Sequence, residues 1–516
     1  MKKILTSSQA QKLDALTMAA QGVSSYELME RAVCELYAHL KAFVGNVDGK
    51  RFVVVSGTGN NGGDGLGLAR KLKEDNADVT VCMCDFSTNI SPECLVNLNK
   101  VNDMGIRVLS AKEELDVCFP SDDNAIVVDA IFGTGLNRSV AGGYAKVIEA
   151  INNFPGKVVS IDIPSGLFAD DNRGNDGAIV KADLTLSIQD YHLSAMLAEN
   201  SMYYGDIRIV DIGHDKDSLS SFVTEFYYLE KADIVKLIKP RHDFDHKGTF
   251  GHALLVVGGV GKAGAAIMAS RACMRAGVGL LTVHVPVEIS NIMQVAVPEA
   301  MLELNGDNIR NNNTMSVEKY SSIGVGPGIG VGSSAVAEVD SLITCGKPMV
   351  MDADALNILA ADNSKLAKIA NCVLTPHPKE FERLFGRMSS TLDKLKFMSD
   401  FSRSHNSVVV LKGGVTAISL TNGHVVFYNG RNPGIATGGS GDVLTGIVTS
   451  LLAQGYCIDE AATIGVWLHG EAGKLAASRL GRISTIATDI IDCLPDVCRS
   501  VENRMAMLDV VLHAKS

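Results

Sequence analysis

The sequence lacks the cysteine spacing that structural zinc sites require. Its 11 cysteines are scattered over 516 residues, and no C-x-x-C pair is followed by a second such pair or by paired histidines. Cys82 and Cys84 lie in the apolar run VTVCMCD, where small buried thiols are expected. Scattered, unpaired cysteines are typical of a reducing compartment, so we expect a cytoplasmic protein.

Positive charge and long apolar stretches are also scarce. Lys and Arg number 47 against 58 Asp and Glu, which gives a net charge of −11 and argues against nucleic acid or an anionic membrane as the main partner. No apolar stretch spans a membrane without glycine-rich or charged interruption. The opening MKKILTSSQAQKLDAL turns polar before a signal-peptide core could form. We therefore expect no membrane segment and no leader, and small molecules as partners.

A Walker-type phosphate loop is missing as well. The nearest match, GGVGKAG at residues 258–264, has neither Ser nor Thr after Lys262 and lacks the full G-x-x-x-x-G-K spacing. Any nucleotide must therefore be held by another kind of loop.

Apolar, strand-like runs alternate with helical patterns along the chain. Near-continuous apolar strands separated by helices indicate a parallel sheet covered on both faces. The runs TAISLTNG and HVVFYNG, residues 416–430, instead predict an antiparallel hairpin that turns at TNGH. The expected strands of the first part are 51–56, 78–84, 106–109, 125–132, 157–164, 184–189 and 206–213.

The alternation pauses at residues 214–238 and restarts with ALLVVGG, residues 253–259. The two parts do not repeat one another. We therefore predict two different α/β domains, residues 1–220 and 221–516, the first with a Rossmann-like parallel sheet and helices on both faces.

Three strand ends of the first domain carry polar residues: GTGNNGGDG at 57–65, DAIFGTGLNRS at 129–139 and SIDIPSG at 160–166. Ligands of parallel sheets bind where such loops converge. The glycine spacing, with Asp85 some twenty residues on, also fits a dehydrogenase that binds a nicotinamide cofactor. Taken singly, Asp129 and Asp162 would be structural acids. Together with Asn61 and Ser165 they supply oxygen ligands suited to a hard cation.

The second domain carries ATGGSGDVLTGIV, residues 436–448. Its glycines place free N–H groups at the start of a helix, and Asp442 lies in the first helical turn. An acidic residue in the first turn of a helix often has no further role than a favourable interaction with the helix dipole. An anion hole beside a base is, however, what phosphoryl transfer to a hydroxyl requires. In DADALN, Asp352, Asp354 and Asn357 are either ligand groups or strand-end caps, and we favour caps.

The first-domain motifs, with LMERA near the N-terminus, resemble the epimerase domain of the NAD(P)H-hydrate repair enzymes over residues 1–215. The resemblance implies that Asp162 acts as acid or base and contacts the hydrated nucleotide. It also implies that Asn61, Asp129 and Ser165 hold a potassium ion. The remaining implied substrate contacts are Asn60, Asn61, Gly62, Gly63, Asp64, Gly133, Thr134, Gly135, Leu136, Asn137, Arg138 and Ser139.

The second domain resembles the ribokinase-like fold and, more narrowly, the ADP/ATP-dependent NAD(P)H-hydrate dehydratases over residues 225–502. The motifs are GKAGAA, GVGPGIG, DADALN, TPHPKEFERL, LKGGVT and GGSGD. The resemblance implies that Asp442 is catalytic and that Glu380 is a candidate Mg²⁺ ligand; from its position before a helix alone, His377 would be a cap. The implied contacts to the S-form hydrate are Ala265, Gly328, His377 and Asp442; those to ADP or ATP are Lys412, Gly413, Gly414, Val415, Thr416 and Gly441.

Together the two resemblances imply repair of NADHX and NADPHX: one domain interconverts the R and S hydrates, and the other dehydrates the S form with ADP or ATP. Relatives of this kind assemble, so a homo-oligomer is expected. One alternative is an NAD-dependent oxidoreductase fused to a ribokinase-like small-molecule kinase. A second is a non-catalytic nucleotide sensor, which would be expected to have eroded sites.

Overall fold

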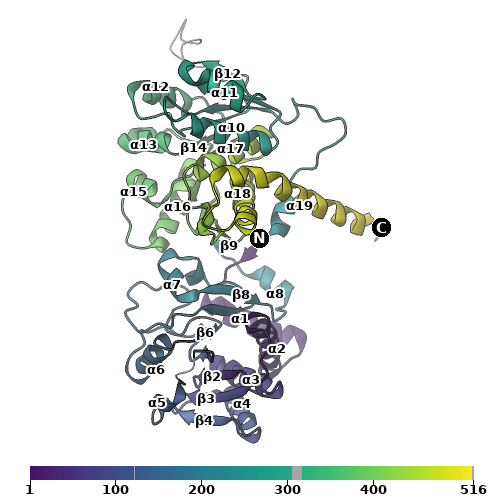
Figure 1. Ribbon diagram of the computed structural model, residues 1–516, viewed down its shortest axis with the longest axis vertical. Helices are drawn as coiled ribbons and strands as arrows, with labels where there is room; N and C mark the ends of the chain where they lie inside the picture. The colour runs from purple at the N-terminus through teal and green to yellow at the C-terminus, as the bar shows by residue number, and fades with distance from the viewer. Residues whose placement is uncertain (121–122, 305–315, 514–516) are drawn as a thin grey trace. The chain divides into compact units, whose positions relative to one another are not determined.

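A computed structural model describes residues 1–120, 123–304 and 316–513 of the chain. The chain forms two compact units (Figure 1). One unit is Lys3–Thr224, and the other comprises Glu225–Ser516 with Met1–Lys2. Each unit contains one β-sheet with helices packed against it, so the predicted α/β class is confirmed.

The N-terminal unit has a seven-stranded sheet in the order β4-β3-β2-β5-β6-β7-β8. All neighbouring pairs are parallel, as the buried apolar runs predicted. The strands are β2 (Arg51–Ser56), β3 (Asp78–Met83), β4 (Arg107–Ser110), β5 (Ile126–Ala130), β6 (Lys157–Ile161), β7 (Leu184–Ile188) and β8 (Asp206–Val210).

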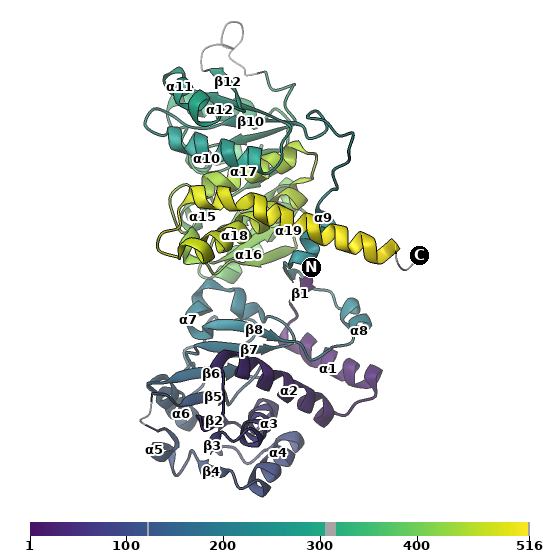
Figure 2. The ribbon, with the colours of Figure 1, turned by 45° about the vertical axis from the view of Figure 1, so that its right-hand side comes forward.

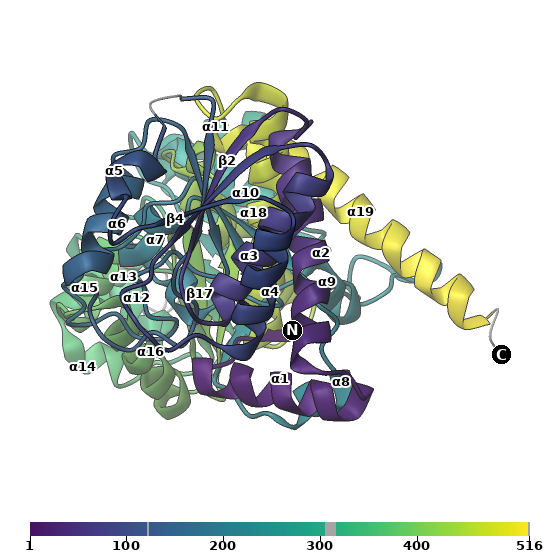
Figure 3. The ribbon, with the colours of Figure 1, turned by 90° about the horizontal axis from the view of Figure 1, so that it is seen from below.

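Both faces of this sheet are buried because alternate side chains point to opposite sides. Phe52 and Val54 pack with residues of α2 to α4, whereas Val53 and Val55 pack with residues of α6. Figure 3 shows α3 and α4 on one side of these strands and α5 and α6 on the other. The helices are α1 (Ser7–Gln21), α2 (Ser25–Val44), α3 (Asn60–Glu74), α4 (Pro92–Asp103), α5 (Leu115–Cys118), α6 (Gly142–Asn152), α7 (Ser201–Tyr204) and α8 (Lys216–Ser221).

The strand order reverses between β2 and β5. From β2 the chain builds outward to β3 and β4, then returns to place β5 on the other side of β2. The loops that follow β2 and β5 therefore diverge and leave a crevice at the carboxyl ends of these strands. Crevices of this kind are where open α/β sheets bind ligands.

The C-terminal unit has an eleven-stranded sheet in the order β1-β9-β18-β17-β16-β15-β14-β13-β10-β11-β12. Strands β16, β17 and β18 are antiparallel, which confirms the predicted hairpin. Strands β9 and β12 were not foreseen: β9 lies within residues 214–238, where the alternation pauses, and β12 is a four-residue strand at the edge of the sheet. The strands are β1 (Lys2–Lys3), β9 (Phe226–Tyr228), β10 (His252–Val256), β11 (Leu280–Val285), β12 (Met301–Leu304), β13 (Ser322–Val325), β14 (Met349–Met351), β15 (Cys372–Leu374), β16 (Val408–Leu411), β17 (Val415–Ser419) and β18 (Val425–Asn429).

Helix α17 lies at the centre of this unit, in contact with α10, α18 and strand β13. Gly446 permits its close approach to α10, because a Cβ there would lie 2.1 Å from the backbone oxygen of Ala269. Figure 2 shows α18 and α19 running beside one another. The helices are α9 (Lys231–Leu237), α10 (Ala263–Arg275), α11 (Ser290–Ala296), α12 (Ser333–Leu342), α13 (Asp354–Ala361), α14 (Asn363–Leu366), α15 (Pro378–Phe385), α16 (Thr391–His405), α17 (Ser440–Ala453), α18 (Ile458–Leu480) and α19 (Ala487–His513). Within the described residues, the helices lack the combination of length and apolarity that a membrane crossing needs.

Candidate active sites

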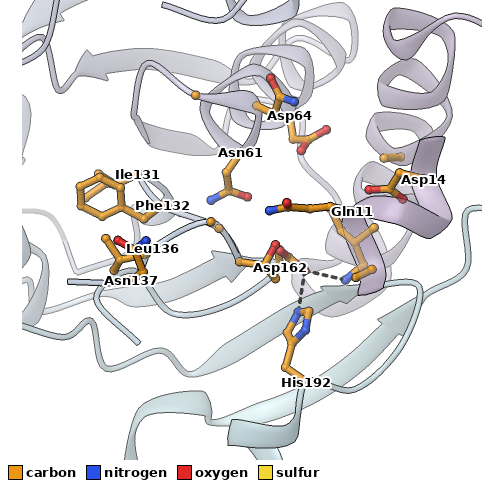
Figure 4. A pocket seen from close by; sticks show the side chains of 18 of the residues that line it. Gln11, Asp14, Asn61, Asp64, Ile131, Phe132, Leu136, Asn137, Asp162 and His192 are labelled. Carbon is orange, nitrogen blue, oxygen red and sulfur yellow. Dashed lines mark hydrogen bonds and ion pairs between the residues drawn. The ribbon is translucent and has the colours of Figure 1, made fainter. Parts of the chain in front are cut away.

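A cavity of about 1380 Å³ opens at the switch point of the N-terminal sheet. Figure 4 shows Asn61 and Asp64 at the start of α3, Ile131 to Asn137 on the loop after β5, and Asp162 facing them. Gly62 and Gly63 do not line it; a Cβ at Gly62 would lie 2.0 Å from the backbone oxygen of Gly57. The predicted substrate contacts that line the cavity are Asn60, Asn61, Asp64, Gly133, Thr134, Gly135, Leu136, Asn137, Arg138, Ser139 and Asp162.

Asp64 lies in the first turns of α3 and is 8% exposed. Burial raises the pKa of its carboxyl well above the usual value, and the charges of Asp162 and Asp14 raise it further. Four carboxyl groups line the cavity, those of Asp14, Asp64, Asp162 and Asp190, and that of Asp64 is favoured in its neutral form. A neutral carboxyl can donate a hydrogen bond to a ligand oxygen.

Asp162 follows β6 in a left-handed backbone conformation, with φ of +65°. Its Oδ1 accepts a hydrogen bond from Nε2 of His192 at 2.8 Å and one from the amide of Ile188 at 3.3 Å. Its Oδ2 is turned the other way, 3.3 Å from where a Cβ of Gly133 would lie. One oxygen is therefore held by the protein while the other faces the loop after β5.

Asp129 and Ser165 lie beneath the cavity and are fully buried. Asp129 Oδ2 accepts hydrogen bonds from the hydroxyl of Ser160 at 2.7 Å and the amide of Ser165 at 2.9 Å. Burial raises the pKa of Asp129, and these hydrogen bonds oppose the rise. The Ser165 hydroxyl in turn accepts from the amide of Phe132 at 2.9 Å.

These residues fit a monovalent cation bound through oxygen. No cationic side chain pairs with Asp129 in the described part of the chain, and a buried carboxylate without a counter-charge is costly. The buried Nδ2 of Asn61 has no hydrogen-bond partner among the described residues. Turning that amide over would place its oxygen there as a ligand. The described residues contain no cluster of three or more His, Cys, Asp or Glu suited to a metal ion. The candidate oxygen ligands here are the hydroxyl of Ser165, the amide oxygen of Asn61 and the single carboxylate of Asp129.

The C-terminal unit collects its predicted residues at the carboxyl ends of β14, β15 and β16. Asp352 follows β14 and is almost fully buried; its Oδ1 accepts from Nζ of Lys412 at 2.8 Å. Its Oδ2 accepts from the hydroxyl of Thr445 on α17 at 3.0 Å. A Cβ at Gly441 would lie 3.2 Å from both Asp352 Oδ2 and Lys412 Nζ. The glycine turn before α17 therefore lies directly against this ion pair.

Asp442 occupies the first turn of α17, as predicted. Burial raises the pKa of its carboxyl to about 6, with a further rise from Asp352 and an opposing effect of Lys412. Such a carboxylate is a stronger base than an exposed one and is still ionised at neutral pH. These are the properties of a general base.

His377 and Glu380 stand at the start of α15, next to the ion pair. His377 is the N-cap, with Nδ1 accepting from the amides of Lys379 and Glu380, which confirms the capping interpretation. Glu380 is buried, and its Oε2 lies 4.0 Å from Nζ of Lys412. Nε2 of His377 lies 3.4 Å from Oε1 of Glu380, and the His377 side chain is 44% exposed, so the cap leaves part of the imidazole accessible from the site.

Ala265 and Gly328 meet at the neighbouring strand ends. A Cβ at Gly328 would lie 3.3 Å from Cβ of Ala265 and from Cβ of Lys262. Lys262 pairs with Asp354 at 3.2 Å, and the same carboxylate accepts from the amide of Gly330 at 2.8 Å. Asp352 likewise accepts from the amide of Ala353 at 2.9 Å, so both acids cap backbone amides at strand ends, as predicted, and each also forms an ion pair.

Both halves of the chain match known families. The model of the NAD(P)H-hydrate dehydratases matches residues 253–496, and that of the YjeF-related protein N-terminus matches residues 25–193. The bifunctional NAD(P)H-hydrate repair enzyme of Moorella thermoacetica is 33% identical over 97% of this chain and 98% of its own length. This chain belongs to the family of bifunctional NAD(P)H-hydrate repair enzymes.

Other members of the repair family show the same full-length relationship. The bifunctional NAD(P)H-hydrate repair enzyme of Escherichia coli K12 is 31% identical, covering 92% of this chain and 89% of that protein. A solved structure similar to the C-terminal unit is the ADP/ATP-dependent NAD(P)H-hydrate dehydratase of Bacillus subtilis, co-crystallised with ATP/Mg²⁺. It is 27% identical and covers 53% of this chain and 98% of that chain, with a TM-score of 0.47.

Sequence reasoning missed several residues of this repair enzyme. Gln11 and Asp14 of α1 line the N-terminal cavity, and so does His192, which pairs with Asp162. A signal for His192 was available, because it follows the expected strand 184–189 just as the other polar loops follow theirs. For Gln11 and Asp14 the only signal was a polar face on a helix, which is usually solvent-exposed.

Proposed function

We propose that the N-terminal unit epimerises the R and S forms of NAD(P)HX and that the C-terminal unit dehydrates the S form to NAD(P)H with ADP or ATP. We assign residues 1–220 to the first activity and 221–516 to the second. Support comes from the two family matches, which lie inside these limits. The observation that carries the proposal is that each unit places one half-buried aspartate, Asp162 or Asp442, at the ligand end of its sheet.

For epimerisation, Asp162 is the acid–base group. Inversion at C6 of the hydrated ring needs one group that takes up a proton and gives it back, whether the ring opens or hydroxide departs. Oδ2 of Asp162 faces the cavity while Oδ1 is held by His192. We assign the contacts to the substrate to the residues of the loops after β2 and β5 that line the cavity.

Asn61, Asp129 and Ser165 would hold the potassium ion of the epimerase site. A bound cation supplies positive charge beneath the cavity, where the negative phosphates of the substrate and the Asp129 carboxylate both need compensation. Asp129 would contribute the charge of the site, and Ser165 and Asn61 neutral oxygens.

Replacing Asp129 with asparagine should remove the stabilisation of the N-terminal unit by potassium. In the wild type, the unfolding temperature should be higher in KCl than in an equal concentration of LiCl, because the ion binds only the folded site. In Asp129→Asn the unfolding temperature should be the same in KCl and in LiCl. Differential scanning fluorimetry measures this directly. The matched variant Asp183→Asn, which removes an exposed carboxylate of the same unit, should keep the potassium effect. If the unfolding temperature of the wild type were the same in KCl and LiCl, the potassium site would be refuted.

For dehydration, Asp442 takes the proton of the C6 hydroxyl as that oxygen is phosphorylated. Loss of phosphate from C6, together with loss of a proton from the neighbouring ring carbon C5 to water, then restores the double bond of NAD(P)H. Phosphate leaves far more readily than hydroxide, which explains the need for ADP or ATP. The amides at the start of α17, with Gly441, stabilise the charge on the transferred group. We assign the nucleotide to Lys412, Gly413, Gly414, Val415, Thr416 and Gly441, and the hydrate to Ala265, Gly328, His377 and Asp442.

Mg²⁺ accompanies the nucleotide, and Glu380 is the residue we assign to it. Mg²⁺ in nucleotide sites keeps several waters and uses one or two carboxylates. Glu380 fits that pattern because it is buried at the strand ends, near Lys412. When bound, the ion neutralises charge on the phosphates.

Dehydratase activity should fall at low pH as Asp442 becomes protonated. Its pKa is raised to about 6, and only the ionised form can act as a base. We therefore expect kcat/KM to be level above pH 7 and to fall about tenfold per pH unit well below pH 6. A pH profile of the S-hydrate reaction at saturating nucleotide measures this. A profile that stays level down to pH 5 would contradict the role of Asp442.

We also propose a cytoplasmic homo-oligomer. All 11 cysteines are free, which supports a reducing compartment. Leu480, Ile483 and Ile486 are exposed together at the turn between α18 and α19, an arrangement often found at subunit contacts. Sedimentation of the wild type should show an oligomer that Ile483→Glu weakens; a monomer at micromolar concentration would refute it.

The proposed function is tested by supplying purified S-hydrate with ADP or ATP and following the absorbance of the reduced nicotinamide. The absorbance should return in full, and R-hydrate should be recovered at the rate of its epimerisation. An NAD-dependent oxidoreductase fused to a small-molecule kinase would instead leave the hydrate untouched.

A further inference from the structure

His192 is a buried histidine beside Asp162, the proposed acid–base group. It follows β7 and is 8% exposed, and both it and Asp162 line the N-terminal cavity. Its Nε2 lies 2.8 Å from Oδ1 of Asp162 (Figure 4). We propose that His192 is a positioning residue of the epimerase: it directs Oδ2 of Asp162 toward the substrate hydroxyl and supplies the positive charge that balances this carboxylate. The inference rests on the proposed role of Asp162.

The orientation of Asp162 depends on few contacts. Its backbone is in the left-handed region, which is uncommon outside glycine and aims the side chain away from the extended strand direction. Two donors then fix Oδ1, the imidazole of His192 and the amide of Ile188. The hydrogen bond from the Ile188 amide is 3.3 Å long, whereas that from the His192 imidazole is 2.8 Å long. The imidazole is therefore the main restraint on the torsion of the Asp162 carboxylate. Rotation of this group would remove Oδ2 from the cavity.

The charges around His192 favour its cationic form. Burial alone lowers the pKa of the imidazole, but Asp162, then Asp170 and Asp190, raise it above the ordinary value. Asp64 on α3 and Asp14 on α1 line the same cavity, and the charge of Asp64 interacts with that of Asp162 and with that of Asp14. Asp14 has its own histidine partner, His214, at 2.7 Å. The positively charged side chain that lines the same cavity is Arg138.

This arrangement gives the pair a defined proton cycle. When the ring opens, the proton of the C6 hydroxyl passes to Oδ2 of Asp162 and the C6–N1 bond breaks, with its electron pair going to N1. When this bond re-forms on the other face of C6, Oδ2 returns the proton to the oxygen, so no other reactant is consumed. His192 keeps its own proton on Nε2 throughout. It binds Oδ1 most strongly when Asp162 is ionised, because a charge-assisted hydrogen bond is stronger than a neutral one. His192 therefore stabilises Asp162 as the acceptor that begins each cycle.

His192→Gln tests the proposal, because glutamine keeps a donor but carries no charge. We expect epimerase kcat to fall roughly 10- to 100-fold at neutral pH, the usual cost of losing an orienting partner, with KM little changed. In the wild type, kcat should decline as pH rises through the raised pKa of His192, since the imidazole then loses its charge. In His192→Gln this alkaline decline should be absent. His192→Lys, which restores a cation, should recover part of kcat and move the decline to higher pH.

The controls separate this inference from the proposed function. His39→Gln replaces a histidine of α2 that does not line the cavity and should behave as the wild type. Dehydration of S-hydrate by the same variant proteins reports that the C-terminal unit is folded, and the unfolding temperature measured by differential scanning fluorimetry reports the state of the N-terminal unit. If His192→Gln keeps the wild-type kcat and pH profile while Asp162→Asn is inactive, the role of His192 is wrong and the proposed function stands. If Asp162→Asn also keeps full epimerase activity, the proposed function itself fails.

Discussion

Replacing Asp442 with asparagine should reduce dehydration of S-hydrate by at least about 100-fold and leave epimerisation unchanged. The carboxylate is proposed to take the hydroxyl proton, and loss of a general base typically costs about 10²- to 10⁴-fold. Asparagine has nearly the same shape and cannot accept that proton at its amide nitrogen. The effect should fall on kcat, because the variant retains the glycine turn that we propose binds the phosphates.

The measurement is the rate of NADH recovery from pure S-hydrate at saturating ADP or ATP. Asp362→Asn, a change of the same kind at the exposed cap of α14, should keep the wild-type rate. The fold should survive in Asp442→Asn, since its first-turn position and the nearby Lys412–Asp352 pair are not disturbed. A rate within threefold of the wild type would remove Asp442 from the mechanism.

Asp162→Asn should abolish enzymatic epimerisation in the same way, again by about 10²- to 10⁴-fold. The amide can keep the contact of its oxygen with His192 and the amide of Ile188, but its other end becomes NH₂ and cannot accept a proton. Residual exchange between the R and S forms should equal the rate in buffer. Dehydration of S-hydrate should be unaffected.

Separation of R- and S-hydrate by liquid chromatography measures this loss. Asp183→Asn provides the matched control in the same unit. The Asp183 carboxylate accepts a backbone hydrogen bond at the start of β6, and the side-chain oxygen of asparagine can still accept it. Wild-type exchange in Asp162→Asn would show that another group, such as Asp64, moves the proton.

The scaffold and most of the candidate site could be predicted from the sequence because their signals are local. Apolar runs of five or six residues followed by glycine and polar residues mark strands and the loops at their carboxyl ends. That pattern correctly placed Asn61, Asp64 and Gly133 around one cavity. It also placed Asp442 in the first turn of α17, since GGSGD precedes an apolar helix.

The remaining parts of both sites depend on contacts between distant segments. Lys412 and Asp352 are 60 residues apart, and no spacing in the sequence indicates that they form an ion pair. The pair of His192 with Asp162 depends on the left-handed turn at Asp162 and on the path of the loop after β7. Asp14 reaches the cavity only through the packing of α1, which no local pattern specifies.

The most direct test of the account is to combine the two single variants on an equal mixture of R- and S-hydrate with ADP or ATP. Asp162→Asn alone should recover the S half and then slow to the uncatalysed rate of epimerisation, whereas Asp442→Asn alone should recover almost none. Mixed together, they should recover all of the NADH, because each protein supplies the activity that the other lacks. Recovery by the mixture no faster than by Asp162→Asn alone would contradict two separate activities on one chain.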